Sequence, residues 1–335
     1  MALLHGVAPY DIGRLVWKHV LSTPYGLSQI LFRATPLIFT GLAVAIAFQT
    51  GLFNIGAEGQ AVVGSLALAT VGCTFSGLPA LLLWPLVLGA GLFMGGFWGW
   101  IPGWLKARWG THEVINTIML NFIALALSNY VISHHLAMPE SVRTADVAPS
   151  LWLPRLSGLW PATQGSPVNL SFVIAVFLAI AIHFFLKSTR AGFALRAAGR
   201  GPRAALWAGV KVNRAIILSM ALSGAMASLV GLNTVLGYKH YYEDGMTGGV
   251  GFIGIGVALL ARNNPIAIIP SALFFGFLSF TGLAINHLVP KEAVDVLTGA
   301  ILILAILAEA WRRKRNRAVR AFTKRSGETG GGGDK

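Results

Sequence analysis

Long apolar stretches, each about as long as a membrane-crossing helix, recur along the whole 335-residue chain. About 20 apolar residues in a helix cross the hydrocarbon core of a bilayer. Segments of about 10 residues with alternating polarity, which a membrane β-barrel needs, are absent from the sequence. The pattern predicts an all-α, polytopic helical membrane protein with nine visible spans. We expect them at 30–49, 57–75, 81–104, 114–136, 168–187, 214–236, 247–262, 266–287 and 294–311.

Two stretches interrupt this pattern where a helix is expected. "GLFNIGAEGQ" (51–60) places Asn54, Glu58 and Gln60 among glycines inside an apolar region, and "GGVGFIGIG" (248–256) has five glycines in nine residues, Gly251 and Gly254 among them. Glycine disfavours a helix, and irregular backbone within a membrane is tolerated only against protein or a watered cavity. Both stretches are therefore predicted to be broken helices, which tend to mark a transport path.

Glu58 raises a specific question, because a carboxylate in hydrocarbon is costly unless something compensates it. It can pair with a cation, accept or donate hydrogen bonds while protonated, or face a watered cavity. Arg33 is the basic residue of the two surrounding spans and lies at the far end of its span, so an ion pair is the weakest option. We expect free backbone N–H groups near the neighbouring glycines to help hold the carboxylate, with Asn54 and Gln60 completing a hydrogen-bonded wall. Whether Glu58 serves transport or only braces the break stays open.

Other spans carry small or amide side chains at regular intervals. Asn116 and Asn121 are five residues apart, so they do not share one helix face, and one of them is expected to bond across helices while the other faces a cavity. Two rows of small residues at intervals of four predict close helix packing: Gly91, Gly95, Gly99 and Gly103, and Ser219, Ser223, Ala227 and Gly231.

The distribution of basic residues predicts how the chain is oriented in the membrane. Only 11% of the residues are charged, against about 25% in soluble domains, yet the net charge is +14. The basic residues gather in the loop 188–213 and in the tail 312–335, and basic loops stay on the cytoplasmic side. We therefore expect a cytoplasmic C-terminus, contact with membrane lipid and an external loop at 137–167, and no binding of nucleic acid. Residues 1–29 are only moderately apolar, which favours an amphipathic surface segment; alternatively, a first span is missing and the full number is ten.

Four blocks of sequence resemble a known family. "ATPLIFTGLAVAIAFQTGLFNIGAEGQ" (34–60), "GTHEVINTIMLNFIA" (110–124), "LRAAGRGPRAALWAGV" (195–210) and "GFIGIGVALLARNNP" (251–265) look like permease subunits of bacterial ABC importers for nucleosides and simple sugars. These are relatives of the ribose and branched-chain amino-acid permeases. The resemblance covers residues 30–311 and implies a permease domain in the bacterial inner membrane. It also implies the partners: two ATPase subunits, a second related permease, and a substrate-binding lipoprotein or periplasmic protein.

The resemblance makes 188–213 a coupling loop that docks on the ATPase. The stretch "GFALRAAGRGPRAALWAGV" (192–210) is expected to form a short surface helix broken at "GRGP", with Arg196, Arg200, Ala204 and Gly209 as docking candidates; a solvated basic loop is the alternative. The chain has no G-x-x-x-x-G-K-[ST] phosphate loop, so ATP hydrolysis is expected on a separate subunit, and we expect no cofactor or metal.

The predicted function is therefore a nucleoside permease rather than an enzyme. A simple-sugar permease is the alternative. An ion-coupled secondary transporter is less favoured, because it ordinarily places several ionisable groups at mid-membrane and Glu58 is the main candidate here.

Overall fold

The computed structural model describes residues 9–286 except 139–140, 159–162 and 164, and beyond them only 296, 299–300, 303–304 and 311. Its described part is helical, and the only β-pairing within it is two isolated bridges, Arg143 with Glu243 and Arg155 with Asn169. Six described helices are long and apolar enough to cross a membrane. The predicted all-α polytopic membrane fold is thus confirmed, while the expected span 294–311 lies largely outside the described residues.

The helices follow the predicted spans closely. In chain order they are α1 (Pro9–Val16), η2 (Trp17–Leu21), α2 (Pro24–Gln49), α3 (Ala57–Thr74), α4 (Ala80–Trp109), α5 (Glu113–Val131), η3 (Ile132–Leu136), η4 (Pro149–Leu151), η5 (Leu156–Gly158), α6 (Ser171–Ser188), α7 (Arg190–Arg200), α8 (Pro202–Trp207), α9 (Val212–Ser228), η7 (Leu232–Lys239), α10 (Val250–Leu260) and α11 (Pro265–Ala284).

Two helix starts show how the local sequence sets these bounds. α2 begins six residues before the expected span, because Pro24 fits the first turn and the Thr23 hydroxyl accepts a hydrogen bond from the Gly26 N–H at 3.0 Å. α11 begins at Pro265, and the Asn264 side chain accepts from the Ile266 N–H at 3.2 Å. The stretch "RNNP" (262–265) therefore forms the turn between α10 and α11.

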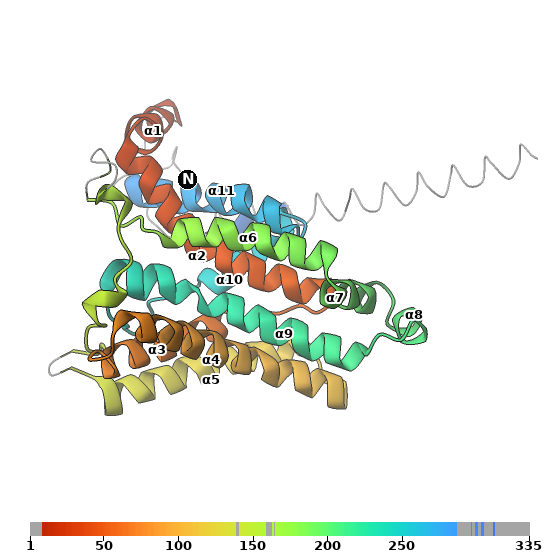
Figure 1. Ribbon diagram of the computed structural model, residues 1–335. Coiled ribbons are helices and arrows are strands. Elements are labelled where there is room, and N and C mark those ends of the chain that lie inside the picture. Colours follow the sequence, from red (N-terminus) through yellow and green to blue (C-terminus); the bar gives the residue numbers. More distant parts are fainter. Residues whose placement is uncertain are drawn as a thin grey trace, which may run out of the picture.

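α2 is the central helix of the bundle. It is apolar around its circumference, and 83% of its most apolar window is buried inside the protein, as expected for a helix that is surrounded by others. In Figure 1 the long helices run side by side, with α7 and α8 at one end of the bundle and α1 at the opposite end. The Gln49 side chain donates to the Asn263 carbonyl at 3.3 Å, so the end of α2 and the turn before α11 lie together.

α4 and α9 pack backbone against backbone through small residues. A Cβ added to Gly95 would lie 2.6 Å from the Gly224 carbonyl oxygen, and one added to Gly99 would lie 2.3 Å from that of Met220. The predicted packing role of the glycine row of α4 is confirmed. The row of α9 that begins with Ser219 and Ser223 turns instead toward α2 and the segment after it, where Ser219 Oγ lies 2.7 Å from Thr50 Oγ1.

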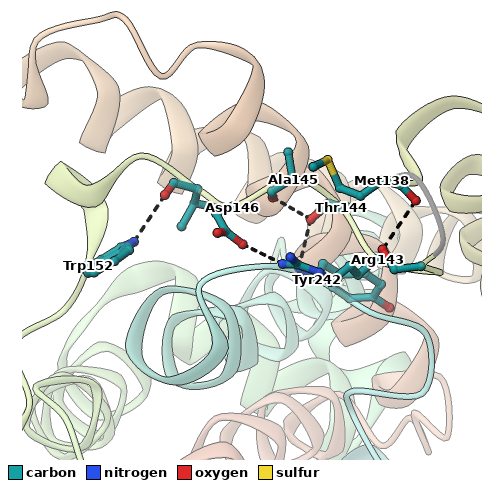
Figure 2. Close-up of polar contacts among 9 residues, drawn as sticks. Met138, Arg143, Thr144, Ala145, Asp146, Trp152 and Tyr242 are labelled. Carbon is teal, nitrogen blue, oxygen red and sulfur yellow. Dashed lines mark hydrogen bonds and ion pairs between the residues drawn. The ribbon is translucent and has the colours of Figure 1, made fainter.

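The loop between α5 and α6 is fastened to the chain that follows η7. The Thr144 N–H donates to the Tyr242 carbonyl at 2.9 Å, and the Tyr242 N–H donates to the Thr144 hydroxyl at 3.0 Å. Figure 2 shows this contact beside the Arg143–Asp146 ion pair of 2.7 Å. The Trp152 indole donates to the Val147 carbonyl at 3.2 Å. The described part of this loop therefore forms a cap at the end of the bundle opposite α7 and α8.

We predict that Gly95→Ala destabilises the bundle, because the new methyl group meets backbone that cannot move without separating α4 from α9. Overpacking of this kind costs typically about 1–3 kcal/mol. Gly89→Ala is the matched control, since its Cβ would meet nothing within 4 Å. Thermal unfolding of the purified variants checks the prediction, and equal unfolding temperatures for both variants would contradict the packing argument.

Candidate functional site

Two helices begin inside the bundle rather than at its ends. After α2, residues 50–56 are non-helical before α3 starts at Ala57, and residues 240–249 form turns before α10 starts at Val250. The Thr40 hydroxyl donates to the Val250 carbonyl at 3.0 Å, which places the start of α10 beside the middle of α2. With 11 residues, α10 is about 16 Å long. The expected full span at 247–262 is therefore wrong: this helix is too short to cross a bilayer alone.

The Glu58 carboxylate joins the two helix starts. One oxygen accepts from the Thr247 hydroxyl at 2.5 Å and from the Gly249 N–H at 3.0 Å, and the other accepts from the Gly251 N–H at 2.7 Å. Glu58 itself lies in the first turn of α3 and is only 4% exposed. A side chain from one broken helix thus caps the N-terminus of the other.

This geometry answers what compensates Glu58. The two backbone N–H groups only donate, so the carboxylate serves as their acceptor at the start of α10. Among the described residues Glu58 has no ion-pair partner, and Arg33 instead donates to the Ser279 hydroxyl at 3.2 Å. The N–H donors come from the second glycine-rich stretch and not, as expected, from the glycines beside Glu58.

Gly251 and Gly254 allow α10 to approach its neighbours. A Cβ on Gly251 would lie 2.3 Å from the Glu58 backbone nitrogen, and a Cβ on Gly254 would lie 2.3 Å from the Thr40 hydroxyl. The close approach at Gly251 is what brings the α10 N–H groups within reach of the carboxylate. Both glycines are buried in helix contacts.

Asn54 and Gln60 form a second hydrogen-bonded group on the same segment. Asn54 Nδ2 donates to Gln60 Oε1 at 2.9 Å and to the Ser223 hydroxyl at 2.7 Å, while its Oδ1 accepts from the Gly56 N–H at 2.9 Å. The Ser223 hydroxyl also donates to the Ala43 carbonyl at 2.6 Å. Three elements, α2, α9 and the 50–56 segment, are therefore held at one point.

The two asparagines of α5 lie in different surroundings, as expected for residues that do not share one helix face. Asn121 is buried and bonds across helices, where its Oδ1 accepts from the Gly59 N–H at 2.8 Å and its Nδ2 donates to the Ile55 carbonyl at 2.9 Å. Asn116 is half-buried and donates locally to Thr111 at 2.6 Å. Asn121 thus belongs to the polar layer around Glu58, whereas Asn116 stands near the start of α5, apart from it.

Sequence reasoning missed two members of this layer. Thr247 precedes the glycine-rich stretch, and Ser223 was interpreted only as a small packing residue. Each was detectable as a hydroxyl beside or between predicted breaks, but nothing in the sequence showed which acceptor it faces. Among the described residues no group of three His, Cys, Asp or Glu side chains is placed to hold a metal ion.

The loop 188–213 folds as two short helices, α7 and α8, separated at Gly201, as "GRGP" predicted. Arg196 donates to the Gly192 and Lys187 carbonyls at 3.4 and 3.3 Å, which fastens α7 to the end of α6. Arg200, Ala204 and Gly209 are exposed, and Gly209 forms a left-handed turn with φ of 80°.

α8 also carries apolar side chains that the sequence analysis did not select. Leu206 is 59% exposed and Trp207 is 93% exposed. Figure 1 shows α8 projecting beyond the end of α9. The outermost part of the loop is therefore a small helix with an unburied tryptophan.

Comparison with known protein families shows which family the chain belongs to. A family model described as the permease component of branched-chain amino acid transport systems matches residues 26–306. The chain belongs to this permease family. It is therefore a transport component and a multi-pass membrane protein, and both helix breaks and the α7–α8 loop fall within the matched region.

Individual relatives match over most of their length. The chain is 38% identical to the guanosine ABC transporter permease protein NupP of Bacillus subtilis, over 93% of this chain and 90% of the relative. It is 35% identical to the nucleoside ABC transporter permease protein NupB of Lactococcus lactis, over 84% and 79%. It is 33% identical to the glucose ABC transporter permease protein TsgB13 of Haloferax volcanii, over 92% and 83%.

We predict that Glu58→Leu destabilises the permease more than Glu58→Gln does. Leucine leaves the N–H groups of Gly249 and Gly251 without their acceptor, at about 1–3 kcal/mol each, whereas glutamine keeps one oxygen and the shape. Glu58→Gln should assemble nearly normally and lose part of its uptake. Thermal unfolding and uptake, compared at equal protein levels, check both expectations.

The control for these variants is Glu113→Gln, which removes a carboxylate from the 2.9 Å pair with Lys106 at the start of α5. Such partly exposed pairs contribute about 0–1 kcal/mol. A Glu58→Leu protein as stable as the control and fully active would refute the capping role.

Proposed function

We propose that this permease is the membrane-spanning subunit of an ABC importer that takes up nucleosides across the bacterial cell membrane. The observation that carries the proposal is the near full-length similarity to permeases named for guanosine and nucleosides, at 38% and 35% identity. Simple sugars are the second candidate, since the similarity to the glucose permease is 33% over a comparable length.

The polar layer is compatible with a path for a neutral substrate, because most of its side chains are uncharged amides, although these are buried and hydrogen-bonded within the protein. Its side chains Asn54, Gln60 and Asn121 are amides, and its one carboxylate, Glu58, is already occupied by three donors. An ion-coupled transporter needs an ionisable group free to exchange a proton or bind a cation, and Glu58 is committed to α10. In our proposal the two breaks border the translocation path, with Gly251 and Gly254 at the second of them, whereas Asn116 stands apart from this region near the start of α5.

The α7–α8 loop is proposed to be the docking element for the ATPase subunits. The exposed Leu206 and Trp207 support this role, because an apolar helix tip that projects from the bundle gains by inserting into a groove of a partner. The remaining partners of the proposed importer are a second related permease in the membrane and a substrate-binding lipoprotein or periplasmic protein.

The same loop supports the orientation. Basic residues concentrate on cytoplasmic loops, and the described α7–α8 loop with its flanks carries no acidic residue from Lys187 to Arg214. The proposed topology therefore places α7, α8 and the C-terminus in the cytoplasm. It places the cap formed by the α5–α6 loop outside, where a substrate-binding protein would meet it.

We predict that cells lacking this gene lose uptake of radiolabelled guanosine and regain it with the intact gene. Labelled uridine, adenosine and glucose, measured in the same strains, define the substrate class. Restored glucose uptake without any nucleoside uptake would replace the nucleoside proposal by the sugar one.

We predict that Trp207→Ala weakens co-purification of the ATPase at least fivefold and lowers uptake in proportion, because the side chain with the largest exposed area on α8 is lost. Trp109→Ala is the matched control, since Trp109 is also exposed, at 62%, but ends α4. Trp207→Phe should restore much of the association. Unchanged ATPase recovery with Trp207→Ala would exclude α8 as the docking helix.

A further inference from the structure

A surface cavity of about 290 Å³ lies between α7 and the start of α9. Three of the side chains that line it are basic: Arg190 opens α7, and Lys211 and Arg214 stand at the start of α9. The cavity is separate from the polar layer around Glu58 and from the exposed tip of α8. It lies at the base of the proposed docking loop, and Gly209 of that loop also lines it.

The charge around this cavity is of one sign. Its lining contains no acidic residue, and none of the three basic side chains forms an ion pair within the described part of the chain. Three cations converging on one hollow repel each other, and an anion of matching size relieves that repulsion. The lining is therefore suited to a phosphate group, which Arg and Lys both bind well.

An apolar wall adjoins the basic side chains. Phe193 of α7 is 57% exposed and Leu218 of α9 is 41% exposed, and both line the cavity. Leu218 lies one turn further along α9 than Arg214, about 6 Å, on a helix long and apolar enough to cross the membrane. Basic groups followed within one turn by exposed apolar groups match a molecule with an anionic head and a hydrocarbon tail.

We propose that this cavity binds the headgroup of an anionic phospholipid, such as phosphatidylglycerol, from the cytoplasmic leaflet. The phosphodiester lies among Arg190, Lys211 and Arg214, and the upper acyl chain lies against Phe193 and Leu218. Basic pockets at the cytoplasmic ends of membrane helices recognise such headgroups. The choice of leaflet rests on the orientation given under the proposed function, whereas binding itself does not.

The lipid contacts both α7 and α9, so it anchors the base of the proposed docking loop to the bundle. A free phosphate would satisfy the cations but leave Phe193 and Leu218 exposed, and an ATPase contact is better met by α8, which projects further. The apolar wall is what favours a lipid over either alternative.

The test is native mass spectrometry of the purified permease in detergent, titrated with phosphatidylglycerol or phosphatidylcholine. We expect at least a fivefold preference for phosphatidylglycerol. Arg190→Gln/Lys211→Gln/Arg214→Gln should lower the bound fraction at least fivefold. Arg108→Gln/Arg200→Gln/Arg203→Gln, which removes three exposed cations outside the cavity lining, should keep it within twofold. Arg190→Lys/Arg214→Lys preserves the charge and should retain the lipid even if the glutamine variant fails to fold.

Four outcomes would overturn the proposal. The first two are equal binding of the two lipids and equal retention of the lipid by the cavity and control variants. The third is loss of the lipid from the charge-preserving variant. The fourth is complete displacement of the lipid by an excess of inorganic phosphate. Loss of ATPase association with full lipid retention in the glutamine variant would assign the basic cluster to protein docking instead. Because these measurements need no transport, they fail or succeed independently of the substrate assignment.

Discussion

The capping of α10 by Glu58 is the interaction on which the interior of this permease depends. Inside a membrane no water satisfies the backbone N–H groups at a helix start, yet α3 and α10 both begin there. The Glu58 carboxylate, in the first turn of α3, accepts from the N–H groups of Gly249 and Gly251 at the start of α10. The start of α3 is satisfied separately, since the Gly56 N–H donates to Asn54 and the Gly59 N–H donates to Asn121. The two interrupted helices therefore persist in one bundle because each start meets buried polar acceptors.

Close backbone approach is the condition for that contact. Gly251 lets α10 reach the α3 backbone, and the glycine row of α4 lets the opposite face of α9, at Met220 and Gly224, pack against α4. In lipid, helix association relies on packing and interhelical hydrogen bonds rather than on the hydrophobic effect. The glycines thus serve the polar layer indirectly, since a side chain at these positions would move the donors away from their acceptors.

The sequence predicted the elements well and the contacts poorly, for a physical reason. Apolar length and glycine content are local properties, so the helices, the break at 51–56 and the split at Gly201 were predictable from them. The second break lies earlier than predicted, at 240–249, because residues 250–256 are helical and their glycines allow close packing. Glu58 and Asn121 stood out because a polar group in an apolar span is conspicuous. Their partners did not: the donors to Glu58 lie about 190 residues away in the chain. Only the packing of α10 against α3 shows that Glu58 is the acceptor for the start of α10.

The α7–α8 loop is in direct contact with one of these breaks. A Cβ on Gly199, near the end of α7, would lie 2.1 Å from the Gln49 carbonyl oxygen and 2.9 Å from the Gly51 nitrogen. Backbone therefore meets backbone where α2 ends and the 50–56 segment begins, with no flexible side chain between them. Since Asn54 ties that segment to α9 and Gln60 ties it to α3, α7 cannot move relative to α2 without either displacing the segment or losing this contact. The loop proposed to meet the ATPase and the polar layer proposed to border the path are thus separated by a few residues of rigidly held backbone.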